Sequence, residues 1–156
     1  MSEAHKDSSN AITLPPFIYL GFLAVGLAAD FALPYPLLTN AVQFPLGAVI
    51  IVAGFAILAF AFFRFRAAGT SVHVHQPTTA IITGGAYRFS RNPIYLAMTL
   101  VISGIGITVD GIWVIAMLAP TLLVMHYGVI AREERYLEAK FGKVYLDYKR
   151  SVRRWI

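Results

Sequence analysis

The sequence AVQFPLGAVIIVAGFAILAFAFF, residues 41–63, decides the class of fold. These 23 residues contain no Asp, Glu, Lys or Arg. An α-helix rises about 1.5 Å per residue, so about 20 residues are enough to cross the roughly 30 Å hydrocarbon layer of a bilayer. The segment therefore predicts a membrane-spanning helix.

Three further segments share this character. Residues 15–34 contain one charge, Asp30, near the far end, and residues 93–109 and 111–130 contain none. Buried helices of a soluble protein can be as apolar, but in a chain of 156 residues the remaining sequence is too short to cover four of them. We therefore predict an all-α fold, an integral membrane bundle with four transmembrane helices.

Polar segments flank this bundle, and the whole chain fits a single domain. Residues 1–14 form a polar tail without the basic start and cleavage site of a signal peptide, so we expect the first span to be retained. Residues 131–156 follow the last span and predict one amphipathic helix. Its apolar residues lie three or four apart: Leu137, Phe141, Tyr145, Tyr148 and Val152.

Composition supports a membrane protein. The chain is 58% hydrophobic and 13% charged, whereas soluble domains average about 45–50% and about 25%. The absence of cysteine excludes disulfides, thiolate metal sites and Cys nucleophiles. The net charge of +5 fits contact with anionic lipid in so apolar a chain, and we expect no nucleic-acid partner.

The basic residues predict the topology. Arg64, Arg66, Arg88 and Arg91 lie between the second and third spans, and eight of the other Lys and Arg residues follow the fourth. The remaining connections between spans contain no Lys or Arg. The positive-inside rule then places the central loop and both termini in the cytoplasm, as in a multi-pass protein of the inner or plasma membrane.

The third span begins at Arg91-Asn92-Pro93. Asn is a good N-cap, and Pro suits the first helical position. If this helix starts below the headgroups, its positive end faces a cytoplasmic recess that could hold an anion. A short helix with an ordinary cap is the alternative.

The long loop before this span, residues 67–92, contains His73 and His75, which share a face on an extended segment. A metal needs three or four ligands, and nothing nearby supplies the others. We therefore predict no metal site and regard an interfacial polar loop as the simpler reading.

Three ionisable residues near the end of the fourth span are candidates for chemistry. His126 lies inside the span, seven residues before Glu133 and on roughly the same side, and intramembrane ionisable residues often serve function. Glu133 and Glu134 are adjacent carboxylates flanked by Arg132 and Arg135. Such a pair suits ribose hydroxyls or an amino group, while surface ion pairing and a structural histidine are the alternatives.

Two spaced motifs carry a resemblance to a known family. The first is Gly85-Ala86-Tyr87-x-x-x-Arg91-Asn92-Pro93-x-Tyr95, and after a helical hairpin the second is Glu133-Glu134-x-x-Leu137-x-x-x-Phe141-Gly142-x-x-Tyr145-x-x-Tyr148. In this order they resemble the isoprenylcysteine carboxyl methyltransferase and phospholipid methyltransferase superfamily of membrane enzymes. The resemblance covers roughly residues 67–152, and the first two spans match only in character.

The resemblance implies an S-adenosylmethionine-dependent transfer of methyl to a lipophilic acceptor, such as a prenylcysteine-like carboxylate, a phospholipid amine or another lipid. Membrane lipids are further expected partners. An amine or phenol acceptor would need deprotonation, for which His126 and Glu134 are candidates by location. A cytoplasmic cofactor-binding loop would contribute to a pocket lined by residues carried over from the motifs: Gln76, Ala80, Ile81, Ile82, Tyr87, Asn92, Pro93, Ile94, Tyr95 and Glu133.

The sequence departs from the isoprenylcysteine enzymes at two positions. Asn92 stands where they usually have His, although Asn occurs there in phospholipid methylases. Val129, four residues before Glu133, replaces their substrate-binding Arg. The resemblance therefore favours a lipophilic acceptor other than a prenylcysteine carboxylate.

Two other functions are compatible with parts of the pattern. An NADPH-dependent membrane sterol or enone reductase has a similar C-terminal arrangement, but such proteins are usually much longer. A non-catalytic membrane subunit or transporter fragment is the second. A transport path needs polar groups at mid-depth, whereas the polar motifs here gather at one predicted membrane face.

Overall fold

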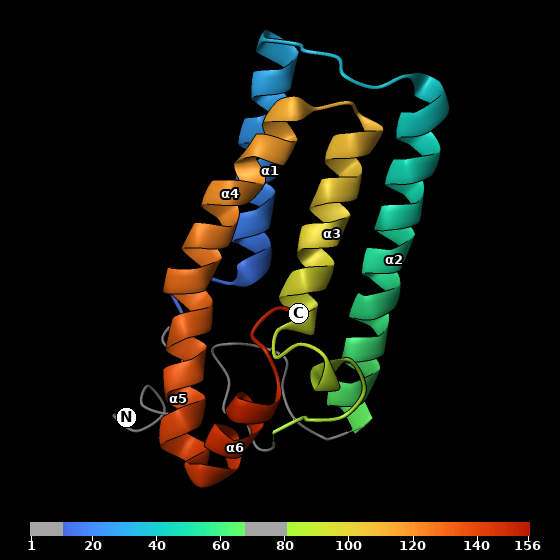
Figure 1. The fold of residues 1–156 in the computed structure, drawn as a ribbon. Helices are drawn as coiled ribbons and strands as arrows, with labels where there is room; N and C mark the ends of the chain where they lie inside the picture. Colours follow the sequence, from blue (N-terminus) through green and yellow to red (C-terminus); the bar gives the residue numbers. More distant parts are fainter. Residues whose placement is uncertain (1–10, 68–80) are drawn as a thin grey trace.

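The computed structural model describes residues 11–67 and 81–156. Within these ranges, four apolar helices run along one another (Figure 1): α1 (Pro15–Ala32), α2 (Asn40–Ala67), α3 (Pro93–Thr108) and α4 (Ile112–Met125). A 3₁₀ turn, η1 (Gly85–Arg88), precedes α3. After α4, the chain continues through a π turn, η2 (His126–Ile130), into α5 (Ala131–Phe141), and then into α6 (Lys143–Ser151).

Membrane-spanning length is reached by three helical segments of the described chain. They are Pro15–Ala32, Asn40–Arg64 and Ile112–Phe141. The fourth apolar helix, α3, has 16 residues, which corresponds to about 24 Å. The predicted all-α membrane bundle is confirmed, with α3 as its short member.

The short helix begins part of the way up the bundle. Figure 1 shows the start of α3 above the lower ends of α2 and α5, with η1 and α6 gathered beneath it. The end of the bundle where α2 ends and α3 begins is called the charged end below. The predicted recess at the start of α3 is thus occupied in part by the chain itself.

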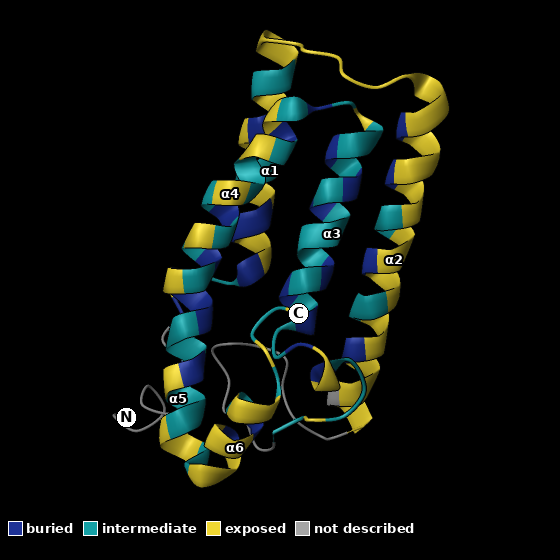
Figure 2. Ribbon diagram, in the orientation of Figure 1, coloured by how far each residue is buried: buried dark blue, intermediate teal, exposed yellow. Residues whose placement is uncertain are grey.

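Lipid-facing side chains account for most of the exposed surface of α2, which Figure 2 shows as exposed along its outer side. Val49, Val52 and Phe55 are 66%, 66% and 55% exposed. A soluble monomer rarely exposes an apolar patch of this extent, whereas hydrocarbon solvates it at no cost. The surface therefore agrees with a membrane environment.

Small residues let α2 and α3 approach closely. A Cβ built on Gly104 of α3 would lie 2.9 Å from the carbonyl oxygen of Gly47 and 2.6 Å from Cγ1 of Ile51, both on α2. Close backbone approach through glycine is a common way to pack helices in lipid. Glycine at position 104 is therefore required by this packing.

The lone acid of the first span has a structural partner. Asp30 of α1 accepts hydrogen bonds from the backbone N–H groups of Trp113 (3.0 Å) and Val114 (3.1 Å) at the start of α4. A carboxylate at this position satisfies donors that have no partner within the helix and complements the helix dipole. Asp30 thus joins α1 to α4 at the end opposite the charged end.

The C-terminal region differs from the single amphipathic helix predicted over 131–156. It forms two helices, α5 and α6, separated at Gly142, whose φ is +52°. Glycine adopts positive φ without steric cost, so the chain can turn sharply there. The turn keeps the predicted apolar residues together, because Leu137, Phe141 and Val152 all pack against a buried cluster that contains Tyr145 and Tyr148.

Candidate functional site

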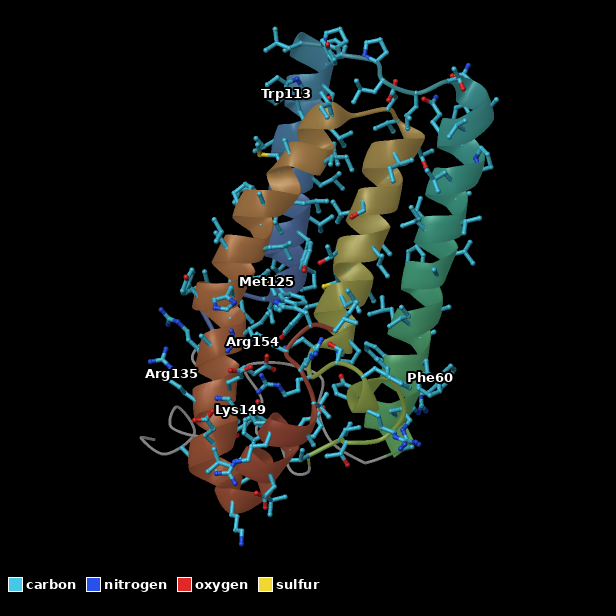
Figure 3. The ribbon with its side chains drawn as sticks, in the orientation of Figure 1. Phe60, Trp113, Met125, Arg135, Lys149 and Arg154 are labelled. Atoms are coloured by element: carbon cyan, nitrogen blue, oxygen red, sulfur yellow. The ribbon has the colours of Figure 1, made fainter. Side chains whose placement is uncertain are left out.

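The motif residues gather at the charged end. They come from η1, the first turn of α3, the η2–α5 segment and the residues that follow α6. Figure 3 shows Arg154 and Lys149 on the inner side of α5, whereas Arg135 lies on its outer side. The site is therefore built where the two motifs of the sequence meet.

A hydrogen bond joins the two motifs directly. The hydroxyl of Tyr95, one turn into α3, donates to Oε2 of Glu133 on α5 at 2.9 Å. Tyr95 is buried, and its backbone carbonyl accepts a hydrogen bond from the hydroxyl of Tyr19 at 3.0 Å. These bonds fix the Glu133 carboxylate against the start of α3.

Glu134 is the centre of a buried ion-pair network. It is 6% exposed. Arg154 donates to it through Nε (2.9 Å to Oε1) and Nη2 (2.7 Å to Oε2). Arg91 Nη1 lies 3.2 Å from Oε1, and Lys149 Nζ lies 3.8 Å from Oε2. Both carboxylate oxygens of Glu134 therefore accept hydrogen bonds from Arg154.

The guanidinium of Arg154 also contacts His126. Nη1 of Arg154 lies 3.1 Å from Nε2 and 3.3 Å from Nδ1 of the imidazole. The hydrogen bond to Glu134 raises the pKa of Arg154, so its positive charge is retained. His126 opens the π turn, in which Ala131 N–H bonds to the His126 carbonyl five residues back. π turns often occur at functional sites, and this one links His126 through Arg154 to Glu134.

The start of α3 is bound by the chain's C-terminal segment, defined here as residues 152–156. Asn92 Nδ2 donates to the carbonyl of Arg154 at 2.9 Å, and Ser90 Oγ donates to the same carbonyl at 3.2 Å. The backbone N–H of Arg91 donates to the carbonyl of Arg153 at 2.9 Å. Asn92 is the N-cap residue of α3, as predicted, but its side chain makes no capping bond.

An aromatic cluster lies below this helix start. Tyr87 of η1 is buried with Tyr145 and Tyr148 of α6, and Tyr148 donates its hydroxyl hydrogen to the carbonyl of Tyr87 at 2.7 Å. Burial raises the pKa of Tyr145 to about 12. Burial, together with the nearby charge of Glu133, raises the pKa of Tyr87 well above its ordinary value. Both phenols are therefore neutral at physiological pH.

Most of the residues carried over from the resemblance meet at this end. Ile81, Ile82 and Ile94 pack against the aromatic cluster, and Pro93 is the fully buried first residue of α3. Two others, Gln76 and Ala80, lie outside the described residues, as do His73 and His75. Within residues 11–67 and 81–156, no group of three or more His, Asp and Glu side chains is placed to hold a metal.

Sequence reasoning included Arg91 in a motif but missed Arg154 and Lys149, two further cations of the site. Arg154 is 20 residues from Glu134 and 28 from His126, and it follows the similar Arg153. No periodicity distinguishes the two. Tertiary folding alone turns Arg154 inward and leaves Arg153 exposed.

A groove lies beside the site, between α3 and α4. Its volume is about 660 Å³, within the roughly 300–1,000 Å³ of typical small-molecule sites. Side chains of both helices make its walls, together with His126 and Trp155. The lining includes Leu96, Thr99, Leu122, Leu123, His126 and Trp155.

The sequence matches one family model and is similar to parts of two known proteins. The sequence model of the phospholipid methyltransferase family matches residues 42–144. An uncharacterized protein of Haemophilus influenzae is 57% identical over 35 residues, 22% of this chain and 56% of that protein. The cobalt-zinc-cadmium resistance protein CzcN of Cupriavidus metallidurans is 33% identical over 77 residues, 49% of this chain and 35% of that protein. The chain thus spans about half or less of these relatives, and no solved structure matches it.

Proposed function

Because the chain belongs to the phospholipid methyltransferase family, we propose that it uses S-adenosylmethionine to methylate a lipophilic acceptor at the charged end of the bundle. The observation that carries the proposal is the Tyr95–Glu133 hydrogen bond beside the start of α3. When bound, the cofactor supplies an electrophilic methyl group on a sulfonium centre.

The charged groups of the site fit the methionine end of such a cofactor, which carries an ammonium and a carboxylate. Glu133 supplies an acceptor for the ammonium or for ribose hydroxyls. Arg91 supplies a donor: its side chain is 8% exposed, and its Nε has no hydrogen-bond partner among the described residues. The first turn of α3 lacks a side-chain cap, so its N–H groups also favour an anion.

The apolar groups fit the rest of the cofactor. Tyr87 offers an aromatic ring, and Ile81 and Ile82 pack against the cluster that contains it. An aromatic and aliphatic surface suits the adenine ring, because stacking and burial of flat apolar faces are both favourable. Glu133, Arg91 and this surface together support a site for the whole cofactor.

The charge distribution supports an orientation for the site. Within residues 11–67 and 81–156, the basic residues lie at the charged end, which we assign to the cytoplasmic side by the positive-inside rule. A polar cofactor would then enter from the cytoplasm, and a lipophilic acceptor from the bilayer. The chain's main task would be to hold the two in line, since orientation alone can supply several kcal/mol.

The proposed roles of the ionisable residues follow from their surroundings. Glu133 orients the cofactor, and Glu134 holds Arg91 and Arg154 in place through its ion pairs. His126 borders the groove and would accept the proton of a neutral amine or phenol acceptor. An acceptor that is already ionised would need no base.

The test is binding of S-adenosylhomocysteine to the purified protein in detergent, measured by calorimetry. We expect Glu133→Ala to weaken binding at least about tenfold, which is about 1.4 kcal/mol. Glu138→Ala is the matched control, because Glu138 lies on the same helix and pairs with Lys149 instead. Binding of NADPH in place of S-adenosylhomocysteine would support the reductase alternative, and equal affinity of both variants would exclude the assigned role of Glu133.

A further inference from the structure

The groove between α3 and α4 opens sideways. Leu123 and Tyr127, which line it, are 59% and 68% exposed. In a bilayer, large exposed apolar side chains face hydrocarbon. A molecule could therefore enter this groove from the lipid without crossing water.

A cation stands at the polar border of the groove. His126 lines the groove, and its imidazole touches the guanidinium of Arg154. Arg154 contacts Glu134 through Nε and Nη2, and its Nη1 is the nitrogen that lies against His126. Among the described residues, no Asp or Glu side chain stands in the lining.

Trp155 is fixed at the same place by the C-terminal segment. The carbonyl of Arg154 accepts hydrogen bonds from Ser90 and Asn92, and Arg91 N–H bonds to the carbonyl of Arg153. The indole packs against the core between the helices and lines the groove. The C-terminal segment thus connects the groove wall to the start of α3.

We propose that this groove binds the apolar body of an anionic amphiphile, with its acid head toward Arg154 and its chain against Trp155. An ammonium head would meet the guanidinium of Arg154 beside His126 and find no carboxylate among the described lining residues. Charge complementarity therefore selects an acid over an amine. That the amphiphile is the methyl acceptor rests on the proposed function; the binding preference itself does not.

The fluorescence of Trp155 can report binding in the groove. The chain has two tryptophans, so in Trp113→Phe the fluorescence reports the groove alone. The protein is placed in nanodiscs of zwitterionic lipid and titrated with dibromostearic acid or with dibromostearylamine, whose bromines quench a tryptophan in contact. We expect saturable quenching by the acid with half-saturation at least about tenfold lower than for the amine. Equal or tighter binding of the amine, or no saturation by either, would overturn the proposal.

Matched variants separate groove binding from partition into lipid. In Trp155→Phe the remaining Trp113 lies near the opposite end of the bundle (Figure 3), and we expect no saturable quenching there. Arg154→Gln should remove the preference for the acid, and Arg153→Gln, with the same charge change at an exposed side chain, should keep it. If Arg154→Gln does not fold, Lys149→Gln should reduce the preference; an unchanged preference would contradict the assignment.

Calorimetry with S-adenosylhomocysteine on the same samples distinguishes this proposal from the proposed function. Acid preference without S-adenosylhomocysteine binding would contradict only the methyltransferase assignment. Binding of S-adenosylhomocysteine without acid preference would contradict only the groove assignment.

Discussion

Glu133 and Glu134 are adjacent in the chain and have different surroundings. Glu133 accepts a hydrogen bond from the neutral hydroxyl of Tyr95, whereas Glu134 is surrounded by Arg91, Lys149 and Arg154. A bidentate guanidinium pair is among the stronger charge-assisted contacts. Glu133 is therefore placed to bind a ligand, whereas Glu134 is placed to hold the protein's own cations.

This division predicts different effects on stability. Glu134→Gln leaves the buried Arg91 and the partly exposed Arg154 without this counter-charge. Breaking a fully buried pair costs about 3–5 kcal/mol, and exposure to solvent reduces that cost. We expect a clear fall in the thermal midpoint of the purified protein. Asp147→Asn is the control, since the Asp147–Arg150 pair is exposed and such pairs contribute little. Equal midpoints for the two variants would show that the network is not structural.

Different contacts hold the helix pairs α1–α4 and α2–α3 together. Asp30 joins α1 to the start of α4 through backbone hydrogen bonds. Glycines bring α2 and α3 together, with Gly47 and Gly104 in close contact. Long apolar runs of sequence predict that these helices exist. They do not predict which helices pair, because every apolar face is equally acceptable to lipid.

The α2–α3 contact predicts an effect of adding one methyl group. Gly104→Ala would place a Cβ within 3 Å of Ile51 and of the Gly47 backbone, so the helices must separate. We expect a lower thermal midpoint in detergent. Gly21→Ala on α1 is the control, because its Cβ would have no neighbour within 4 Å and alanine favours helix. A midpoint for Gly104→Ala at or above that of Gly21→Ala would refute the packing.

At the charged end, the sequence predicts some features of the structure and not others. Asn92 and Pro93 predict the start of α3 from local chemistry alone. The break at Gly142 was missed, because the apolar spacing of residues 137–152 reads equally well as one helix. The roles of Arg154 and Trp155 depend on a chain reversal over many residues, for which the sequence carries no local signal.

The positive charges of the described residues lie at one end of an apolar bundle, together with the site. This asymmetry leads to the assigned orientation. The chain contains no cysteine, so single cysteines can be introduced on an unmodified background. We expect Ser151→Cys to react with an impermeant maleimide only after cells are opened, and Thr39→Cys to react in intact cells. The reverse pattern would contradict the orientation.

We propose that the site at the start of α3 serves methyl transfer from S-adenosylmethionine to a lipophilic acceptor. The most direct measurement is transfer of labelled methyl from S-adenosylmethionine into the lipid fraction, with the protein in nanodiscs that contain a native lipid extract. We predict labelled lipid with the native protein and at least about tenfold less with Glu133→Gln at an unchanged thermal midpoint, a loss of about 1.4 kcal/mol or more. No labelled lipid from the native protein, or equal labelling by both, would contradict it.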